Sequence, residues 1–355
     1  MTKDAPLDPS AAPPRLGRVV EVHGILATVA LAREERTALA RDAECEERTS
    51  RAILDGERLR CRLPRDRTTP VVGDVVDVTL DPRGEARITV VHARERVFAR
   101  MGPNGPMPIA ASVDRLVIVT AAHPGPRLGL IDRMAIACDP GVPILIVLNK
   151  DDMPEVAAAR ALLADHTAQG WPILTTSAAT GAGVEALRET LGDGISVLVG
   201  HSGVGKSTLV NRLVPGARLL TGDVHDTTGK GRHTTTVTTV HVMNAHALVV
   251  DTPGVRAFPL DGMPLTRIAE RFPGLGEVVE RCHFAGCLHE GEPGCAVADA
   301  VAAGSVPAAR VQRWHQLLAA LREEDAQAPA RTRRARQAGG TAGGGSKGPP
   351  PRQRR

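Results

Sequence analysis

Hydrophobic residues follow two different patterns along this chain, and the change falls near residue 110. Between residues 15 and 95, short segments with alternating apolar positions, such as "RLRCRL" and "EARITVVHA", are separated by turn signals such as "DPRG". Short strands at close spacing predict a small β-barrel over residues 15–98. A five-stranded oligonucleotide-binding (OB) barrel fits this length, and an SH3-like barrel fits the pattern nearly as well.

From residue 110 to residue 262, nearly continuous apolar runs alternate with helix-like segments. The runs are "RLVIVTAA", "PILIVLNK", "PILTTSA", "ISVLVG" and "HALVVDTPG". Strands that are buried on both faces have this pattern in parallel sheets, so we expect an α/β domain. Each run ends in a polar or Gly-rich loop, and ligands bind at this edge of an open α/β sheet.

Three further segments lie outside these domains. Residues 1–14 have no apolar core and are expected to be disordered rather than a signal peptide. Residues 326–355 are Gly/Pro/Arg-rich and are also expected to be disordered. They hold eight Lys and Arg and no acid, so they form either a nucleic-acid-binding arm or a solvating tail. Residues 263–325 combine a Cys/His cluster with a helical stripe of Val311, Trp314, Leu317, Leu318 and Leu321.

The amino-acid composition excludes some modes of RNA binding and of membrane association. Aromatic residues make up 2% of the 355 residues, with no Tyr, and residues 15–95 contain no aromatic residue. Base stacking by the barrel is therefore excluded, and RNA contact there would rely on arginine patches. No apolar run approaches the ~20 residues that span a bilayer. We expect a cytoplasmic monomer with no membrane partner.

The stretch "GHSGVGKS" matches the phosphate-loop pattern G-x-x-x-x-G-K-[ST]. A predicted strand precedes it and a predicted helix follows it, as this loop requires. Lys206 is expected to reach the β- and γ-phosphates and to act in catalysis, while Ser207 is expected to bind Mg²⁺. The predicted phosphate-binding residues are Gly200, His201, Ser202, Gly203, Val204, Gly205, Lys206, Ser207 and Thr208.

Two later segments are candidates for sensing the γ-phosphate. In "DTPG", Asp251 is expected to hold Mg²⁺ through water, and Gly254 to offer its N–H group to the γ-phosphate. In "GKGRHTTT", Thr235 is the expected Mg²⁺ ligand, although the sequence does not separate it from its two threonine neighbours. Val255 is apolar where many GTPases have a water-orienting Gln. We therefore expect slow intrinsic hydrolysis, with His233 as the candidate for positioning water.

The guanine-reading elements come before the phosphate loop. In "NKDD", Asn149, Lys150 and Asp152 are expected to bind guanine, because a carboxylate accepts from its N1–H and N2–H₂ groups and adenine has no such donor pair. In "SAATG", Ser177 and Ala178 are expected to present a backbone N–H group to guanine O6. This order of motifs predicts a circularly permuted GTPase domain. An ATP-dependent enzyme remains possible only if Asp152 does not meet the base.

The late cysteine cluster predicts a structural metal site. Cys282, Cys287, His289 and Cys295 lie within 14 residues and supply three thiolates and one imidazole. This donor set forms closed tetrahedral Zn²⁺ sites, so we expect one Zn²⁺ per chain. The alternative is a set of reduced cysteines that bind no metal.

Taken together, these motifs closely resemble those of the RsgA/YjeQ family of small-ribosomal-subunit-dependent GTPases, over roughly residues 15–325. The stretches "GRHTTT" and "CHFAGCLHEGEPGCAV" are the most specific to that family. The resemblance implies an OB barrel, a permuted P-loop GTPase domain and a C-terminal zinc-binding helical domain. It also implies binding to the small (30S) ribosomal subunit and its 16S rRNA late in maturation, with GTP hydrolysis to GDP and phosphate stimulated there. Two alternatives are a permuted GTPase for another ribosomal particle and a GTP-gated, zinc-containing RNA-binding scaffold.

Overall fold

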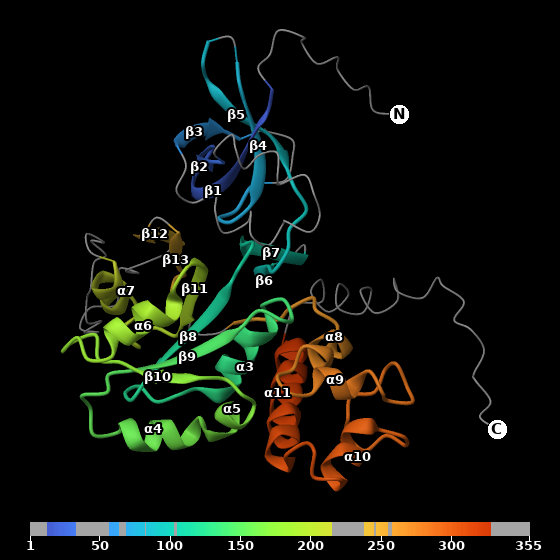
Figure 1. Cartoon of the computed structure of the whole chain (residues 1–355). Coiled ribbons are helices and arrows are strands. Elements are labelled where there is room, and N and C mark those ends of the chain that lie inside the picture. Colours follow the sequence, from blue (N-terminus) through green and yellow to red (C-terminus); the bar gives the residue numbers. More distant parts are fainter. Residues whose placement is uncertain are drawn as a thin grey trace, which may run out of the picture. The chain divides into compact units, whose positions relative to one another are not determined.

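The computed structural model describes residues 13–32, 57–63, 69–81, 83–102, 105–214, 238–244, 246–254 and 258–327. The chain divides into two compact units (Figure 1). The first unit comprises residues 1–99, 108–131 and 138–257, and the second comprises residues 100–107, 132–137 and 258–355. Among the described residues, no helix has both the length and the apolarity that a membrane span requires.

A closed five-stranded barrel forms the N-terminal part of the first unit. Its strands are β1 (Arg15–His23), β2 (Leu26–Leu31), β3 (Arg58–Arg62), β4 (Val75–Leu80) and β5 (Ala86–Val91). They pair in the order β1-β2-β3-β5-β4, and β4 closes the barrel on β1. This order of five strands, with β3 parallel to β5, is that of an OB barrel and decides against the SH3-like alternative.

The barrel encloses an apolar core that includes Val19, Val29, Val76 and Ile88. On β4 and β5 the residues beside Val76 and Ile88 are more exposed, whereas on β1 and β2 the residues beside Val19 and Val29 are mostly buried too. Gly17 allows β1 to cross close to β2, because a Cβ atom at this position would lie 2.5 Å from Val29 Cγ1. After the barrel, β6 (Phe98–Gly102) and β7 (Gly105–Ala110) form a separate two-stranded sheet.

A six-stranded sheet forms the rest of the first unit, in the order β10-β9-β8-β11-β13-β12. All neighbouring pairs are parallel except β12 with β13. The strands are β8 (Arg115–Ala121), β9 (Ile144–Asn149), β10 (Ile173–Thr175), β11 (Gly194–Gly200), β12 (Thr239–Asn244) and β13 (Ala247–Asp251). The associated helices are α3 (Leu128–Ile136), α4 (Val156–Leu162), α5 (Ala164–Ala168), α6 (Val184–Leu191) and α7 (Lys206–Leu213).

The order of the strands in the sheet explains how the base loops and the phosphate loop meet at one edge of the sheet, although the base loops come first in the chain. Strands β9 and β10 carry the predicted base loops, strands β11 and β13 carry the predicted phosphate and metal loops, and β8 lies between the two pairs. Because these five strands are parallel, their carboxyl ends all lie at the same edge of the sheet. The permuted GTPase fold predicted from the motif order is therefore confirmed.

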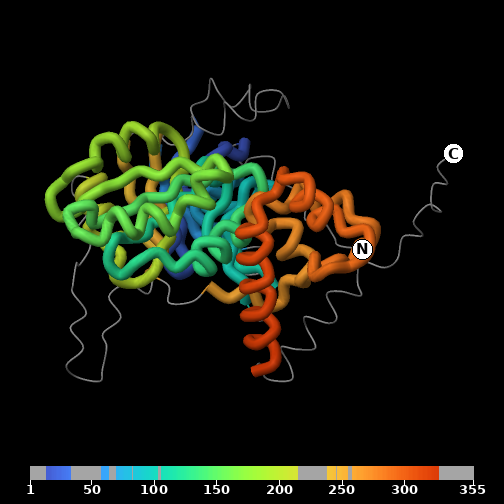
Figure 2. Tube along the Cα trace, turned by 90° about the horizontal axis from the view of Figure 1, so that it is seen from below, coloured from blue at the N-terminus to red at the C-terminus, as the bar shows by residue number. Residues whose placement is uncertain are grey.

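The second unit is mainly helical, and it also includes residues 100–107 from the β6/β7 hairpin and residues 132–137 at the end of α3. Its helices are α8 (Leu265–Glu270), α9 (Gly276–Val279), α10 (Ala296–Ala302) and α11 (Ala308–Gln327). Figure 2 shows α11 as one continuous helix, and its predicted apolar stripe faces the core of this unit. Trp314 is fully buried and packs edge-on against Phe272, with ring centroids 5.5 Å apart.

Candidate nucleotide and metal sites

The predicted phosphate loop connects β11 to α7. Gly205 precedes the helix with a φ of 89°, a conformation that favours glycine. A Cβ atom at Gly205 would lie 2.5 Å from Asn149 Nδ2, and one at Gly200 would lie 2.4 Å from the Val119 carbonyl oxygen. Gly205 therefore allows the phosphate loop to approach the base loop closely, and Gly200 allows β11 to approach β8 closely. The free N–H groups at the start of α7 favour an anion at this loop.

Lys206 and Asp251 form a buried ion pair beside the phosphate loop. Lys206 Nζ lies 3.3 Å from Asp251 Oδ1, and the two side chains are 7% and 0% exposed. Burial is the largest influence on Asp251 and raises the pKa of its carboxyl group, although Lys206 opposes this effect. Apart from the ion pair, neither oxygen of Asp251 has a hydrogen-bond partner among the described residues. An unpartnered carboxylate here fits an Mg²⁺ ion held through water.

The segment that follows β13 lies against the phosphate loop. Thr252 Oγ1 donates to the Leu198 carbonyl oxygen at 2.8 Å, which anchors the segment to β11. A Cβ atom at Gly254 would lie 3.2 Å from Ser202 Cα. The structure thus places "DTPG" next to the phosphate loop, as the sequence predicts.

Asn149 connects the base loops with the phosphate loop. Its Nδ2 atom donates to the Val204 carbonyl oxygen at 2.8 Å. Its Oδ1 atom accepts from Thr176 Oγ1 at 3.1 Å and from the Ala178 N–H group at 3.0 Å. Because Asn149 is only 1% exposed, these bonds form inside the protein. The Ala178 N–H group, expected to face guanine O6, is therefore already bonded to Asn149.

The two predicted base loops also contact each other. Ser177 Oγ donates to Asp152 Oδ1 at 2.5 Å and accepts from the Thr180 N–H group at 3.1 Å. Asp152 is exposed, so its second carboxylate oxygen can accept from a ligand. Lys150 has a φ of 63°, a conformation that non-glycine residues adopt at a cost and that is common at functional sites.

His201 is held in the phosphate loop by its own backbone. Its Nδ1 atom contacts the Ser202 carbonyl oxygen, and its Nε2 atom is buried without a partner among the described residues. Burial is the largest influence and lowers the pKa of His201, with Arg127 and Lys150 acting in the same direction. The contact with the Ser202 carbonyl oxygen opposes this shift in pKa, and the net effect favours the neutral ring.

Several predicted switch residues lie outside the described residues. These are His233, Thr235 with its two threonine neighbours, and Val255. The predicted disordered segments, residues 1–14 and 326–355, also fall almost wholly outside them. The roles given to these positions stay predictions.

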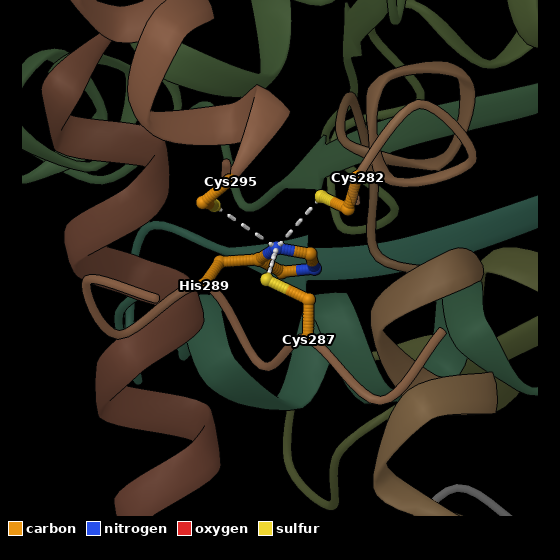
Figure 3. Close-up of side chains that lie close together, drawn as sticks. All are labelled: Cys282, Cys287, His289 and Cys295. Atoms are coloured by element: carbon orange, nitrogen blue, oxygen red, sulfur yellow. Dashed lines mark hydrogen bonds between the residues drawn. The ribbon is translucent and has the colours of Figure 1, made fainter. Parts of the chain in front are cut away.

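The four predicted metal ligands meet in the second unit. Their ligand atoms all lie within 4.8 Å of one another, and three of the four residues are buried. His289 Nδ1 lies 3.6 Å from Cys282 Sγ, 3.4 Å from Cys287 Sγ and 3.5 Å from Cys295 Sγ (Figure 3). A tetrahedral Zn²⁺ with ligands at ~2.3 Å (sulfur) and ~2.0 Å (nitrogen) separates sulfur from nitrogen by about 3.5 Å. The group therefore fits this ion.

The surroundings of the cluster hold its ligands in place. Glu292 accepts from the backbone N–H groups of Leu288 and Glu290, at 2.8 and 2.7 Å. Trp314 Nε1 donates to the Leu288 carbonyl oxygen at 2.7 Å. Burial raises the pKa of the Cys287 thiol to about 12, so thiolates at this site require a compensating cation.

Known proteins that resemble this chain identify its family. The family model described as RsgA GTPase matches residues 91–261. A protein of Ectopseudomonas mendocina named "Small ribosomal subunit biogenesis GTPase RsgA" is 36% identical over 277 residues, which cover 77% of this chain and 81% of the relative. A protein of the same name from Gemmatimonas aurantiaca is 40% identical over 255 residues, covering 69% and 82%. The chain belongs to the RsgA GTPase family. It is therefore a GTP-hydrolysing enzyme.

Solved structures agree with this membership. The crystal structure of YjeQ from Thermotoga maritima matches with a TM-score of 0.64 and 27% identity, covering 87% of this chain and 99% of the other. The crystal structure of YloQ, described as a circularly permuted GTPase, matches with a TM-score of 0.62 and 20% identity, covering 90% and 99%. The second match supports the permuted fold of this RsgA-family chain.

Sequence reasoning missed three residues that support these sites. Thr176 holds the side chain of Asn149, and Glu292 holds the loop of the Cys/His cluster. Arg212, on α7, contacts the base loop. Thr176 and Glu292 lie inside the quoted motifs, so their positions offered a signal. Arg212 is an exposed helical residue that offered none.

Proposed function

We propose that this RsgA-family GTPase acts on the small ribosomal subunit late in its maturation, in the cytoplasm. In this proposal it contacts 16S rRNA, and the subunit stimulates hydrolysis of GTP to GDP and phosphate. The supporting observation is the extent of the match to the named relatives. The GTPase family model covers residues 91–261, whereas the E. mendocina relative aligns over 277 residues. The likeness therefore continues beyond the GTPase domain.

We assign the nucleotide to the sheet edge formed by the loops after β9, β10, β11 and β13. Lys206 and the backbone N–H groups of Gly200–Thr208 would neutralise the phosphates, and Asp152 would accept from the guanine donors. Mg²⁺, when bound with the nucleotide, would neutralise phosphate charge, with Ser207 as a proposed ligand and Asp251 holding the ion through water. Thr235 and His233 keep their predicted roles as metal ligand and water-positioning residue.

The cluster of Cys282, Cys287, His289 and Cys295 is proposed to hold one structural Zn²⁺. All four ligand positions would come from the protein, which leaves no open position for a substrate. The ion would then stabilise the helical unit rather than take part in hydrolysis.

Support for rRNA contact comes from a row of arginines on the barrel. Arg58, Arg60 and Arg62 occupy alternate positions on β3, and all three are exposed. Arg62 pairs with Glu85 at 3.3 Å, but Arg58 and Arg60 have no ion pair among the described residues. Arginine binds phosphate oxygens through its planar set of donors. A barrel without aromatic residues can therefore bind an RNA backbone through charge rather than stacking.

The proposal is tested by measuring GTP hydrolysis at one enzyme concentration, with and without purified small ribosomal subunits. Large subunits serve as the partner control. A Lys206→Ala variant shows whether the activity belongs to this protein. We expect a rise of at least tenfold that is confined to the small subunit, since completing a GTPase site adds about 10³–10⁵-fold.

Other results would select a different function. A rise with large subunits instead would indicate a permuted GTPase for another particle. No rise, with tight GTP binding retained, would favour a GTP-gated RNA-binding scaffold in which turnover is incidental.

A further inference from the structure

Arg212 joins the helix of the phosphate loop to the predicted base loop. It lies near the end of α7, six residues after Lys206. Its Nε atom donates to the Ala178 carbonyl oxygen at 3.1 Å, and its Nη2 atom donates to the Ala179 carbonyl oxygen at 2.8 Å. Two carbonyl groups of adjacent residues are therefore held by one guanidinium group.

These bonds fix the orientation of a peptide group in the base loop. The C=O and N–H groups of a trans peptide point in opposite directions. By binding the Ala178 carbonyl oxygen, Arg212 sets the plane of the Ala178–Ala179 peptide and hence the direction of the Ala179 N–H group. The Ala178 N–H group is bonded to Asn149, and the Thr180 N–H group to Ser177. Among the described residues, the Ala179 N–H group has no partner, so it is available to a ligand.

The same helix carries the phosphate end of the site. With a rise of 1.5 Å per residue, Lys206 and Arg212 are about 9 Å apart along α7. A rigid helix thus separates the group that faces the phosphates from the group that holds the base loop. The guanidinium group of Arg212 has no ion pair with an acidic side chain among the described residues, and these two carbonyl oxygens are its hydrogen-bond acceptors there.

We propose that Arg212 is a positioning residue for guanine recognition. It presents the Ala179 N–H group to the base edge through the Ala178–Ala179 peptide, without itself contacting base or phosphate. The inference rests on the proposed guanine site at this sheet edge. Loss of the Arg212 side chain should weaken the binding of guanine nucleotides and leave the phosphate half of the site unchanged.

The test is an Arg212→Met variant of the full chain, which keeps the length of the side chain and removes its donors. Dissociation constants for GDP and ADP are measured by competition against a fluorescent GDP analogue. We expect about tenfold weaker GDP binding and unchanged ADP binding, with kcat at saturating GTP within about twofold. Tenfold corresponds to ~1.4 kcal/mol, which is the net contribution of one to two hydrogen bonds.

Two further variants separate positioning from folding. Arg160→Met is the control, because Arg160 is also an exposed helical arginine, but its guanidinium group donates to Thr175 Oγ1 and not to a carbonyl oxygen of the base loop. It should leave GDP affinity unchanged. Arg212→Lys keeps the charge but not the paired donors, so its GDP affinity should be intermediate. Because Arg212 is exposed, these changes leave the core intact.

Equal losses for GDP and ADP, or equal effects of Arg212→Met and Arg160→Met, would overturn the inference. Unchanged GDP affinity in Arg212→Met would do the same. Failure of the underlying guanine site is seen separately, as a wild-type protein that binds ADP as tightly as GDP.

Discussion

Replacing Asn149 with alanine is expected to loosen the nucleotide edge of the sheet. The substitution removes one bond to the Val204 carbonyl oxygen and two bonds from Thr176 and Ala178. It leaves one acceptor and two donors unpaired at a position that is 1% exposed. An unpaired buried polar group costs about 1–3 kcal/mol. With partial relaxation, we expect local stability to fall by about 3–5 kcal/mol.

Hydrogen exchange followed by mass spectrometry measures this loss locally. At ~1.4 kcal/mol per tenfold, a loss of 3 kcal/mol makes exchange of β9 and of the phosphate loop more than about 100-fold faster. Asn244→Ala is the matched control, because Asn244 is exposed and, within the described part of the chain, its side chain accepts only from the His246 N–H group. GDP binding should weaken in Asn149→Ala and not in the control. Equal exchange in the two variants, with equal GDP affinity, would show that Asn149 does not hold these loops together.

Three further predictions concern the base, the metal and the RNA. Asp152→Asn should shift nucleotide preference from guanine toward xanthine, whereas Asp151→Asn should not; competition binding decides this, and an unchanged preference would remove Asp152 from the base site. Chelation should speed hydrogen exchange around Trp314 without affecting the sheet, because structural Zn²⁺ stabilises small domains by on the order of 10 kcal/mol; unchanged exchange after metal loss would contradict a structural role. The double variant Arg58→Gln/Arg60→Gln should weaken small-subunit binding and reduce the slope of log K against log salt by about 1–2; an unchanged slope would place the RNA contact elsewhere.

The sequence predicted those parts of the two candidate sites whose residues lie close together in the chain or directly follow a strand. The ligands of the Cys/His cluster lie within 14 residues, so their spacing alone brought them together. The loops of the nucleotide edge each follow an apolar run, and parallel strands place such loops at one edge whatever their order in the chain. Motif and strand pattern were therefore sufficient to predict that the described residues of each candidate site lie together.

What could not be predicted depends on which strands become neighbours. Apolar runs do not encode the sheet order, so the position of β8 between the base and phosphate halves is a structural finding. Strand β12 received no assignment, because an edge strand with half-buried side chains lacks the continuous apolar pattern of the others. The hairpin of β6 and β7 was also unassigned, because residues 99–109 fell between the two predicted domains.

The same limit applies to the contacts that hold the base loop. Arg212 and Ala178 are 34 residues apart, and an exposed helical arginine has no pattern that indicates a carbonyl partner. Likewise, the sequence placed the Ala178 N–H group toward guanine, whereas the structure bonds it to Asn149. Hydrogen bonds between loops compete for the same backbone groups, and that competition is decided only once the loops are folded.

Permutation gives these loop contacts a particular importance. The base loops precede the phosphate loop, and α6 and β11 lie between them in the chain. Strand β8 pairs with both β9 and β11, and two further sets of hydrogen bonds join the loops of the two halves, from Asn149 to Val204 and from Arg212 to Ala178 and Ala179. A bound nucleotide would contact both the base loops and the phosphate loop. The nucleotide and these hydrogen bonds therefore stabilise the same relative position of the loops. Weakening either set of bonds should therefore reduce the affinity for guanine nucleotides, and saturating GDP should in turn restore part of the lost protection from hydrogen exchange.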